Sequence, residues 1–600
     1  MLKTKIYYQI NFRVTSKIFL VAAFSLVLVF LLSQRQDFVT NSGVVSTSYI
    51  VQAVSLEQAL GTVKDVGGEI THELGIINAV GANLTPSQVE YLRQVEGVKV
   101  LENGRVRIAA QNLLASAPPS LLAPNIKSIV ADYDPEAYHT SYVEATKLHS
   151  KGIEGSGVTV AVIDSGYWPN PALDYNSNNQ GRVLMQYDAI TDQKVSDGLP
   201  TVANDDNGHG TYVTSVLMSS ETGIYGSHGV APMANLVSVK AFGADGSGSY
   251  IDVIRGIDFV VQNKSNFNIR VLNLSFSSQA QSLYWQDPLA QAAMAAWHAG
   301  IVVVASAGNR GPDPMTVGVP GNVPYVITVG SVSDAFTRDD STDDYLSSYS
   351  SAGPTIDAFV KPDVVSPGGH LVGLMPKGSY LAQQHPEFHD GGNYFIMSGT
   401  SQAAAVVSGV VALLLDADPT LTPDDVKCRM MSTTRVAQDE NGNLAYSVFQ
   451  QGAGLVNASR AIFANVNLGC GNHGLDVQAD LFNDVHLVGP ARYDSEIGFY
   501  IEGASESYDW DTDYSWDGFT WLDGNPFVDG NPFIDGNPFI DGNPFIDGNP
   551  YLDGNPFLDG NPFLDGNPFL DGNPFLDGNP YLDANLSTVT SSINVWVEQE

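Results

Sequence analysis

Three residues of the sequence carry the side chains that acyl transfer requires, namely Asp164, His209 and Ser401. A serine hydroxyl is a weak nucleophile until a base accepts its proton, and histidine suits that role near neutral pH. A buried carboxylate fixes the histidine tautomer and stabilises the imidazolium that forms. Asp164 follows an apolar run, His209 lies between two glycines that we expect to leave its ring uncrowded, and Ser401 precedes an Ala- and Val-rich segment. The trio predicts an orienting carboxylate, a general base and a nucleophile.

Each of these residues also has an ordinary structural explanation. Ser401 could simply cap the helix that follows it, because serine oxygens accept from the unpaired first-turn N–H groups. Asp164 could likewise be a helix cap, and His209 could be a loop histidine. Asn309, which follows the apolar run of residues 301–305, either lies in an ordinary turn or donates from its amide to an oxyanion. In the catalytic alternative, the N–H of Ser401 at the helix start is a second donor.

The elements that would position these residues follow an alternating pattern. Apolar, β-branched runs occupy residues 157–166, 234–242, 269–276, 300–309 and 323–332, and helix-like stretches such as 248–264 and 287–300 lie between them. Continuous apolar strands are typical of a parallel sheet that is buried on both faces. The alternation predicts an α/β domain with a doubly wound, mostly parallel sheet. In such sheets functional sites lie at the carboxyl ends of the strands, where Asp164 and Asn309 occur.

Four segments, "VIDSG", "GHGTYV", "ASAGNRG" and "SGTSQAAA", resemble in this order the subtilase family of subtilisin-like serine proteases. The resemblance covers about residues 150–464. It implies a subtilisin-like fold and a serine endopeptidase with Asp164, His209 and Ser401 as the triad and Asn309 in the oxyanion hole. It also implies a substrate cleft lined by Leu274, Ser275, Phe276, Ala305, Ser306, Ala307 and Gly308. The family needs no cofactor for its chemistry. Structural Ca²⁺ is compatible with the resemblance, but the metal-binding residues are unknown.

The segment around Ser401 departs from the pattern of the family. Gln402 stands where family members commonly have methionine, Ala405 where proline is usual, and Val406 where histidine is frequent. These positions neighbour the nucleophile without taking part in the chemistry. We therefore expect activity to be kept, in an altered environment of the nucleophile.

The pattern of residues 1–40 is typical of an export signal. Four cations precede the 15-residue apolar run 18–32, which is shorter than the about 18 residues of a typical membrane span. An uncleaved anchor is the alternative, because no clear cleavage site follows. The sequence thus predicts a secreted protein, or one that is anchored on the outer side of the membrane.

The remaining domain boundaries follow from the order of expected strands and helices and from the resemblance to the family. Residues 49–108 have the strand and helix order of a small ferredoxin-like α+β unit, with a helix start at Thr85, and they resemble the inhibitor-type propeptide of the family. Residues 109–141 form a linker and processing region, and the peptidase domain spans 142–466. We therefore expect a zymogen that processes itself, with protein or peptide substrates and its own propeptide as partners.

The C-terminal part is acidic and repetitive. The chain has 28 basic and 65 acidic residues, a balance that argues against nucleic acid as a partner. After an acidic connecting region, 467–520, residues 521–586 form an irregular tail of DGNPF-type hexapeptides with eleven regularly spaced aspartates, followed by the end segment 587–600. The aspartates could bind Ca²⁺, or the tail could simply be solvated. The alternative function is therefore a surface, adhesion or cation-binding protein on a subtilase scaffold.

Cys428 and Cys470 are the two cysteines of the chain. In an exported protein they most simply form one disulfide, and two buried free thiols are the alternative. A metal site is disfavoured because neither lies in a Cys/His cluster.

Overall fold

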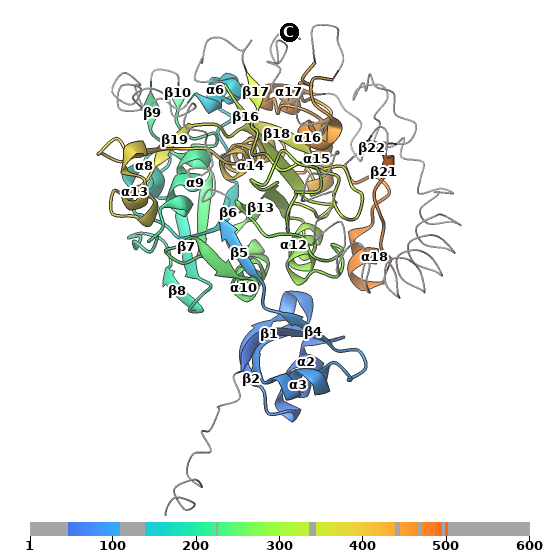
Figure 1. The fold of residues 1–600 in the computed structure, drawn as a ribbon. Helices are drawn as coiled ribbons and strands as arrows, with labels where there is room; N and C mark the ends of the chain where they lie inside the picture. Colours follow the sequence, from blue (N-terminus) through green and yellow to red (C-terminus); the bar gives the residue numbers. More distant parts are fainter. Residues whose placement is uncertain are drawn as a thin grey trace, which may run out of the picture.

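The computed structural model describes residues 46–108, 138–223, 226–334, 344–438, 444–464, 471–483, 485–494 and 498–501. These residues form a large body and a small N-terminal unit that lies against it (Figure 1). The expected export segment 1–40, the hexapeptide tail 521–586 and the end segment 587–600 lie outside the described residues, as does most of the linker 109–141.

The body is built on a nine-stranded sheet, and its main path runs in the order β17-β16-β15-β13-β6-β11-β7-β8, with β18 paired to β16. The strands are β6 (Thr159–Asp164), β7 (Val183–Asp188), β8 (Gln193–Ser196), β11 (Asn235–Lys240), β13 (Ile269–Leu274), β15 (Val302–Ser306), β16 (Ile327–Ser333), β17 (Tyr345–Leu346) and β18 (Val364–Pro367). All pairs are parallel except those of the edge strands β8 and β17. Every residue of β6, β15 and β16 is buried, so both faces of the sheet are covered, as their continuous apolar runs require. The prediction of a doubly wound, mostly parallel α/β fold is confirmed.

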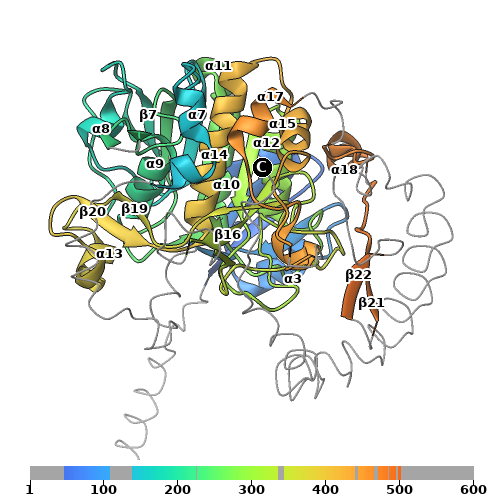
Figure 2. The same ribbon diagram turned by 90° about the horizontal axis from the view of Figure 1, so that it is seen from above.

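Two pairs of helices cover much of the two faces of the sheet. Helix α9 (His209–Met218) packs on α14 (Thr400–Ala417), and α10 (Tyr250–Gln262) packs on α12 (Pro288–His298). Helix α14 runs through the centre of the body, where it contacts the parallel strands β6, β13, β15, β16 and β18 (Figure 2). Among the described residues, α14 is the helix long and apolar enough to cross a membrane, but it is a core helix because residues 400–415 are all buried.

The N-terminal unit is a four-stranded antiparallel sheet in the order β2-β3-β1-β4. Its elements are β1 (Thr47–Gln52), α2 (Leu56–Asp65), β2 (Glu69–Leu74), the short 3₁₀ helix η1 (Gly75–Ile77), β3 (Ala79–Leu84), α3 (Pro86–Leu92) and β4 (Lys99–Glu102). Helix α3 begins with a capping box in which Thr85 and Gln88 satisfy each other's backbone N–H groups. The unit has an apolar core of its own, while Ile50, Leu74, Ile77 and Ala79 belong to the large core cluster of the body.

The short strand β5 (Arg105–Ile108) leaves this unit. The sequence predicts that residues 99–108 close the unit as one piece, but only β4 joins its sheet. Strand β5 pairs in antiparallel fashion with β12 (Ser247–Ser249) and β14 (Phe276–Ser277) of the body. Its partners lie more than a hundred residues further along the chain, so no local pattern predicts the pairing.

The unit also contacts the outer surface of α10 and α12. The amide of Gln52 donates to the Gln291 side chain at 2.6 Å, and His72 lies 3.3 Å from Asp252. The N-terminal unit therefore contacts the body at separate points, through the pairing of β5 and through side chains that reach α10 and α12.

The described part of the connecting region packs on the body. Helix α18 (Val477–Phe482) carries Asp480, whose carboxylate accepts hydrogen bonds from the hydroxyls of Tyr284 at 2.6 Å and Tyr325 at 2.9 Å. Cys428 is buried in α15 (Pro423–Met431) and is disulfide-bonded, while its expected partner Cys470 lies outside the described residues. The hairpin β21 (Ala491–Asp494) and β22 (Gly498–Ile501) ends the described chain.

His139 makes the body sensitive to acid. Its ring is fully buried beside the backbone carbonyl of Val216 in α9, and burial lowers its pKa from 6.5 to about 4. Between about pH 6.5 and 4 the unfolded chain therefore binds the extra proton, so stability falls as the pH falls through this range. The loss is on the order of 3 kcal/mol.

We expect the His139→Phe variant to remove this part of the pH dependence. Chemical denaturation of both proteins between pH 4 and 7 measures it. Parallel stability curves for the two proteins would show that His139 is not the responsible group.

Candidate active site

The candidate site lies at the carboxyl ends of three neighbouring parallel strands. Ile163 of β6 is in register with Leu274 of β13, and Leu274 is in register with Ala305 of β15. The residues that follow these positions therefore emerge side by side at one edge of the sheet. Asp164 comes from the first strand, Ser275 from the second, and the segment that leads to Asn309 from the third.

Asp164 and His209 form a buried contact. The Nδ1 atom of His209 lies 2.8 Å from Oδ1 of Asp164, and their side chains are 0% and 1% exposed. Ser165 donates its backbone N–H to the same carboxylate oxygen at 2.7 Å. The carboxylate is therefore positioned to hold a proton on Nδ1, which leaves Nε2 of the imidazole as an acceptor.

The glycines beside His209 are required by the backbone conformation and by close backbone packing, and not, as the sequence suggested, by the space around the imidazole ring. Gly208 has φ of 100°, a conformation that residues with a side chain rarely adopt. A Cβ on Gly210 would lie 2.5 Å from the backbone oxygen of Gly166. The start of α9 can therefore approach the loop after Asp164 closely enough for the 2.8 Å contact.

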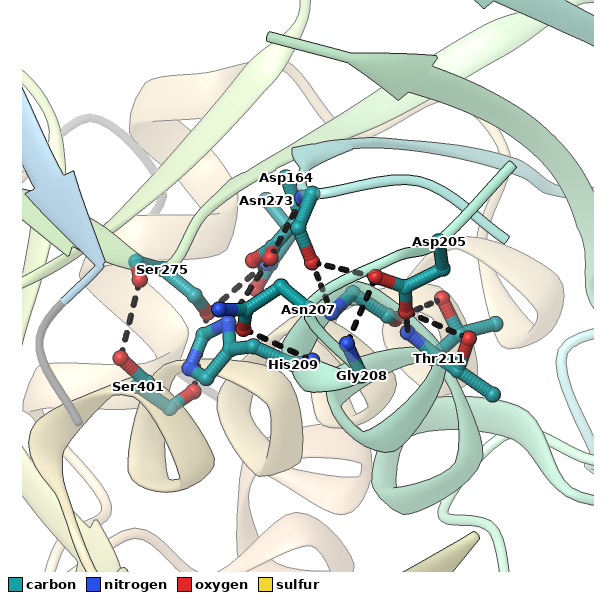
Figure 3. Close-up of polar contacts among 12 residues, drawn as sticks. Asp164, Asp205, Asn207, Gly208, His209, Thr211, Asn273, Ser275 and Ser401 are labelled. Carbon is teal, nitrogen blue, oxygen red and sulfur yellow. Dashed lines mark hydrogen bonds and ion pairs between the residues drawn. The ribbon is translucent and has the colours of Figure 1, made fainter. Parts of the chain in front are cut away.

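Asp205 anchors both sides of this contact and was not singled out from the sequence. One carboxylate oxygen accepts from the Ser165 hydroxyl and the Gly208 N–H, each at 2.8 Å. The other accepts from the backbone and hydroxyl of Thr211 at 2.8 and 2.6 Å. Asp205 thus ties the loop after β6 to the first turn of α9 (Figure 3). The only signal in the sequence is an aspartate four residues before the histidine.

Ser401 lies in the first turn of α14 and is fully buried. Its hydroxyl donates to the backbone oxygen of Ser275 at 2.9 Å, and the Ser275 hydroxyl donates back to the Ser401 carbonyl at 2.9 Å. Asn273 at the end of β13 donates to the Ser275 hydroxyl at 2.9 Å, so strand and helix are linked (Figure 3). Because Gly399 holds the N-cap position and the serine makes no cap bond there, the capping alternative is wrong.

The imidazole Nε2 of His209 is buried and has no hydrogen-bond partner among the described residues. The Asp–His half of the arrangement is thus formed, while the serine hydroxyl is directed to Ser275 instead. Free enzymes often show a loose base–nucleophile contact that tightens when substrate binds. The arrangement can therefore act as a proton acceptor for Ser401 after a rotation of the serine side chain.

Asn309 is held in a defined orientation. Its Oδ1 atom accepts from the backbone N–H of Thr400 at 3.0 Å and from the Thr400 hydroxyl at 2.9 Å. An oxygen that accepts these two bonds leaves the Nδ2 end of the amide facing the other way. That Nδ2 is buried and lacks a partner within the described part of the chain. Thr400 therefore positions a donor next to Ser401.

The cleft beside these residues contains β5. A cavity of about 730 Å³ lies between β5 and the body, and its lining includes Arg107, Ile108, Ser277, Asn309 and Arg310. Arg310 and Ser277 were not predicted from the sequence, although each directly follows a predicted residue.

The expected cleft residues divide into two groups. Ser275 contacts Ser401 and Phe276 pairs with Ile108 of β5, although both are fully buried and neither lines the cavity. The following residues are fully or almost fully buried and are not among the residues that line the cavity: Leu274, Ala305, Ser306 and Ala307. The Ser306 hydroxyl instead supports the cleft by donating to the Phe276 carbonyl at 2.9 Å. Gly308 donates its N–H to the Thr400 hydroxyl at 3.2 Å, behind Asn309.

The described residues contain no group of three or more His, Cys, Asp or Glu side chains that could hold a metal ion. Structural Ca²⁺ therefore stays a prediction without assigned residues.

Comparisons with known proteins agree with this geometry. The sequence model of the Subtilase family (Peptidase_S8) matches residues 155–454. Serine protease AprX of Bacillus subtilis is 35% identical over 60% of this chain and 79% of its own length. Subtilisin J of Geobacillus stearothermophilus is 29% identical over 74% of this chain and 99% of its own length. The crystal structure of fervidolysin from Fervidobacterium pennivorans shares the fold, with a TM-score of 0.53 and 23% identity over 71% of this chain and 62% of that one. The chain therefore belongs to the subtilase family and is a subtilisin-like serine endopeptidase.

Proposed function

We propose that this endopeptidase cleaves peptide bonds through a triad of Asp164, His209 and Ser401, and that it is exported as a zymogen that processes itself. The observation that carries the proposal is the buried 2.8 Å contact between Asp164 and His209. It lies at the carboxyl ends of the strands, where Ser275 accepts the hydrogen bond of the Ser401 hydroxyl. A buried carboxylate that orients an imidazole beside a serine is the arrangement that activates a nucleophile.

The reaction follows from the positions of these groups. Ser401 Oγ exchanges its bond to Ser275 for His209 Nε2, which takes its proton as Oγ bonds to the carbonyl carbon of the peptide. Asn309 Nδ2 donates to the oxygen on which negative charge develops. The C–N bond then breaks, and His209 gives its proton to the leaving nitrogen. Water cleaves the acyl-enzyme by the same steps, and Ser401 recovers its proton.

The position of β5 supports the role of the small unit as an inhibitory propeptide. An extended peptide that pairs with strands on both sides has its backbone N–H and C=O groups satisfied, and its alternate side chains enter the cleft. In β5 the side chains of Val106 and Ile108 are buried, while Arg105 and Arg107 are exposed. The strand thus occupies the cleft in the way that a substrate chain would.

The register of β5 indicates which bond is cut. Ile108, the last described residue of β5, pairs with Phe276, the residue that directly follows Ser275. The backbone oxygen of Ser275 accepts from the Ser401 hydroxyl. The bond between Ala109 and Ala110 is therefore the one that we expect to reach the nucleophile, at the start of the expected processing region 109–141.

Two measurements on the purified protein test this proposal. A fluorophosphonate probe should label Ser401 of the processed enzyme, because the probe reacts only with an activated serine. N-terminal sequencing of that enzyme should find Ala110, or a residue a few positions further along if trimming follows. A folded, processed chain without label on Ser401 would overturn the triad. A first cut before Ile108 or beyond residue 141 would overturn the register.

Export is supported by the four cations and the apolar run in the N-terminal segment. We therefore expect the protein to be extracellular, either secreted or anchored at the outer side of the membrane. Mass spectrometry of the mature protein decides between these two, because an anchored enzyme keeps residues 18–32 on a separate or attached N-terminal fragment.

A further inference from the structure

Gln402, the residue after the expected nucleophile, is unusual in its surroundings. Its side chain lies in the first turn of α14 and is fully buried. Neither the oxygen nor the nitrogen of its amide has a hydrogen-bond partner among the described residues. A buried amide without partners costs about 1–3 kcal/mol, so apolar packing alone does not explain a glutamine here.

A second buried glutamine shows how the same side chain is normally accommodated. Gln451 is also fully buried, and it accepts from the N–H of Ala437 at 2.8 Å and donates to the carbonyl of Tyr446 at 2.7 Å. The fold can thus satisfy a buried glutamine amide. The unsatisfied amide of Gln402 lies beside Ser401, where a reacting group must enter.

The amide of Gln402 lies next to that of Asn309. A Cβ on Gly399 would be 2.6 Å from Oε1 of Gln402 and 3.2 Å from Nδ2 of Asn309. Both amides therefore approach the same face of Gly399, and the missing side chain of this glycine leaves them room. Thr400 holds Asn309 by its oxygen, so its nitrogen is directed away from that bond. Two amide nitrogens without a hydrogen-bond partner among the described residues, one from Asn309 and one from Gln402, therefore lie next to Ser401.

In contrast to the expectation from the sequence that this position takes no part in the chemistry, we propose that Gln402 is a substrate-binding residue of the oxyanion site, whose Nε2 donates to the scissile carbonyl oxygen beside Asn309. The inference rests on the proposed function, since it assumes attack by Ser401. A side-chain amide rotates its nitrogen toward an acceptor at little cost, and the oxyanion is the strongest acceptor that can enter this buried place. Its bond strengthens as charge develops, so the contribution appears in the transition state.

Gln402→Met tests this inference, because methionine has similar length and no donor. We expect kcat on a peptide substrate to fall about 10- to 100-fold with KM changed less than about 3-fold, since the lost donor acts mainly in the transition state. Affinity for a peptide aldehyde, which forms a tetrahedral adduct, should fall by the same factor. Unchanged kcat and aldehyde affinity would overturn the inference.

The matched control is Gln451→Met, which removes an amide that is satisfied by Ala437 and Tyr446. Its thermal midpoint should fall and the kcat of the folded enzyme should stay that of the wild type. The midpoint of Gln402→Met should stay the same or rise, because a buried unpaired amide is removed. A midpoint that falls in Gln402→Met, with kcat of the folded fraction unchanged, would assign Gln402 a structural role and overturn the inference.

A double-mutant cycle with Asn309→Ala separates a direct donor from a residue that acts through Asn309. If Gln402 donates independently, Gln402→Met still lowers kcat in the Asn309→Ala background. Loss of its effect there would contradict the proposed donation. Failure of the proposed function itself is visible beforehand, because the wild type would then take no fluorophosphonate label and hydrolyse no peptide.

Discussion

Replacement of Ser401 by alanine is expected to lower kcat by at least about 10⁴-fold, because alanine has no hydroxyl to form the proposed acyl-enzyme. The variant should also keep its N-terminal unit, since we propose that the same serine cuts the bond after Ala109. Its fold should persist, because the lost hydroxyl makes a single hydrogen bond, to Ser275. Denaturing gel electrophoresis and mass spectrometry detect the unprocessed chain, and a fluorogenic peptide assay measures kcat.

Ser432→Ala is a suitable control for this experiment. The Ser432 hydroxyl also donates to a backbone carbonyl, that of Cys428 at 2.8 Å, but at the end of α15. This variant should be processed and active like the wild type. Processing of the Ser401→Ala chain at Ala110, in a preparation free of other proteases, would show that a different nucleophile performs the cut.

Asp164→Asn should lower kcat by about 10⁴-fold while the fold is kept, the loss expected when a triad carboxylate becomes an amide. In the wild type the carboxylate accepts at 2.8 Å from Nδ1 of His209, and this keeps Nε2 free to take the serine proton. An amide can present its N–H₂ to Nδ1, which places the ring proton on Nε2 and removes the base. Initial rates at substrate saturation measure the loss.

Asp258→Asn is the matched control for a buried carboxyl. Asp258 lies in α10 near Gly75 of the N-terminal unit, and burial raises its pKa above the ordinary value. A neutral amide there should leave kcat of the processed enzyme unchanged. If Asp164→Asn retained more than about a tenth of the wild-type kcat, Asp164 would not be the orienting carboxylate.

Much of the fold follows from local patterns in the sequence. The apolar runs that end at Asp164 and near Asn309 become β6 and β15, because a strand covered on both faces must be apolar at every position. Thr85 and Gln88 begin α3 as expected, since a capping box involves only four consecutive residues. The order of these elements was enough to expect a parallel sheet with its functional residues at one edge.

Contacts between distant segments were not predictable in this way. The role of Asp205 depends on three partners, one in the loop after β6 and two at the start of α9, and that of Thr400 depends on the position of Asn309 some ninety residues earlier. The expectation for Leu274 and Ala305 differs from the structure for the same reason. A residue at the end of a strand faces either the cleft or the core, and a shift of one position reverses its direction.

The sequence by itself determined which side chains are available for chemistry and which strands and helices carry them, because residue type and hydrophobic periodicity are local properties. Only the tertiary structure decided that β5 leaves its own unit for the cleft, that the Ser401 hydroxyl faces Ser275, and that the Gln402 amide is buried unpaired beside Asn309. These facts depend on how segments separated by about ninety residues or more pack together, and the packing of each depends on all its neighbours at once.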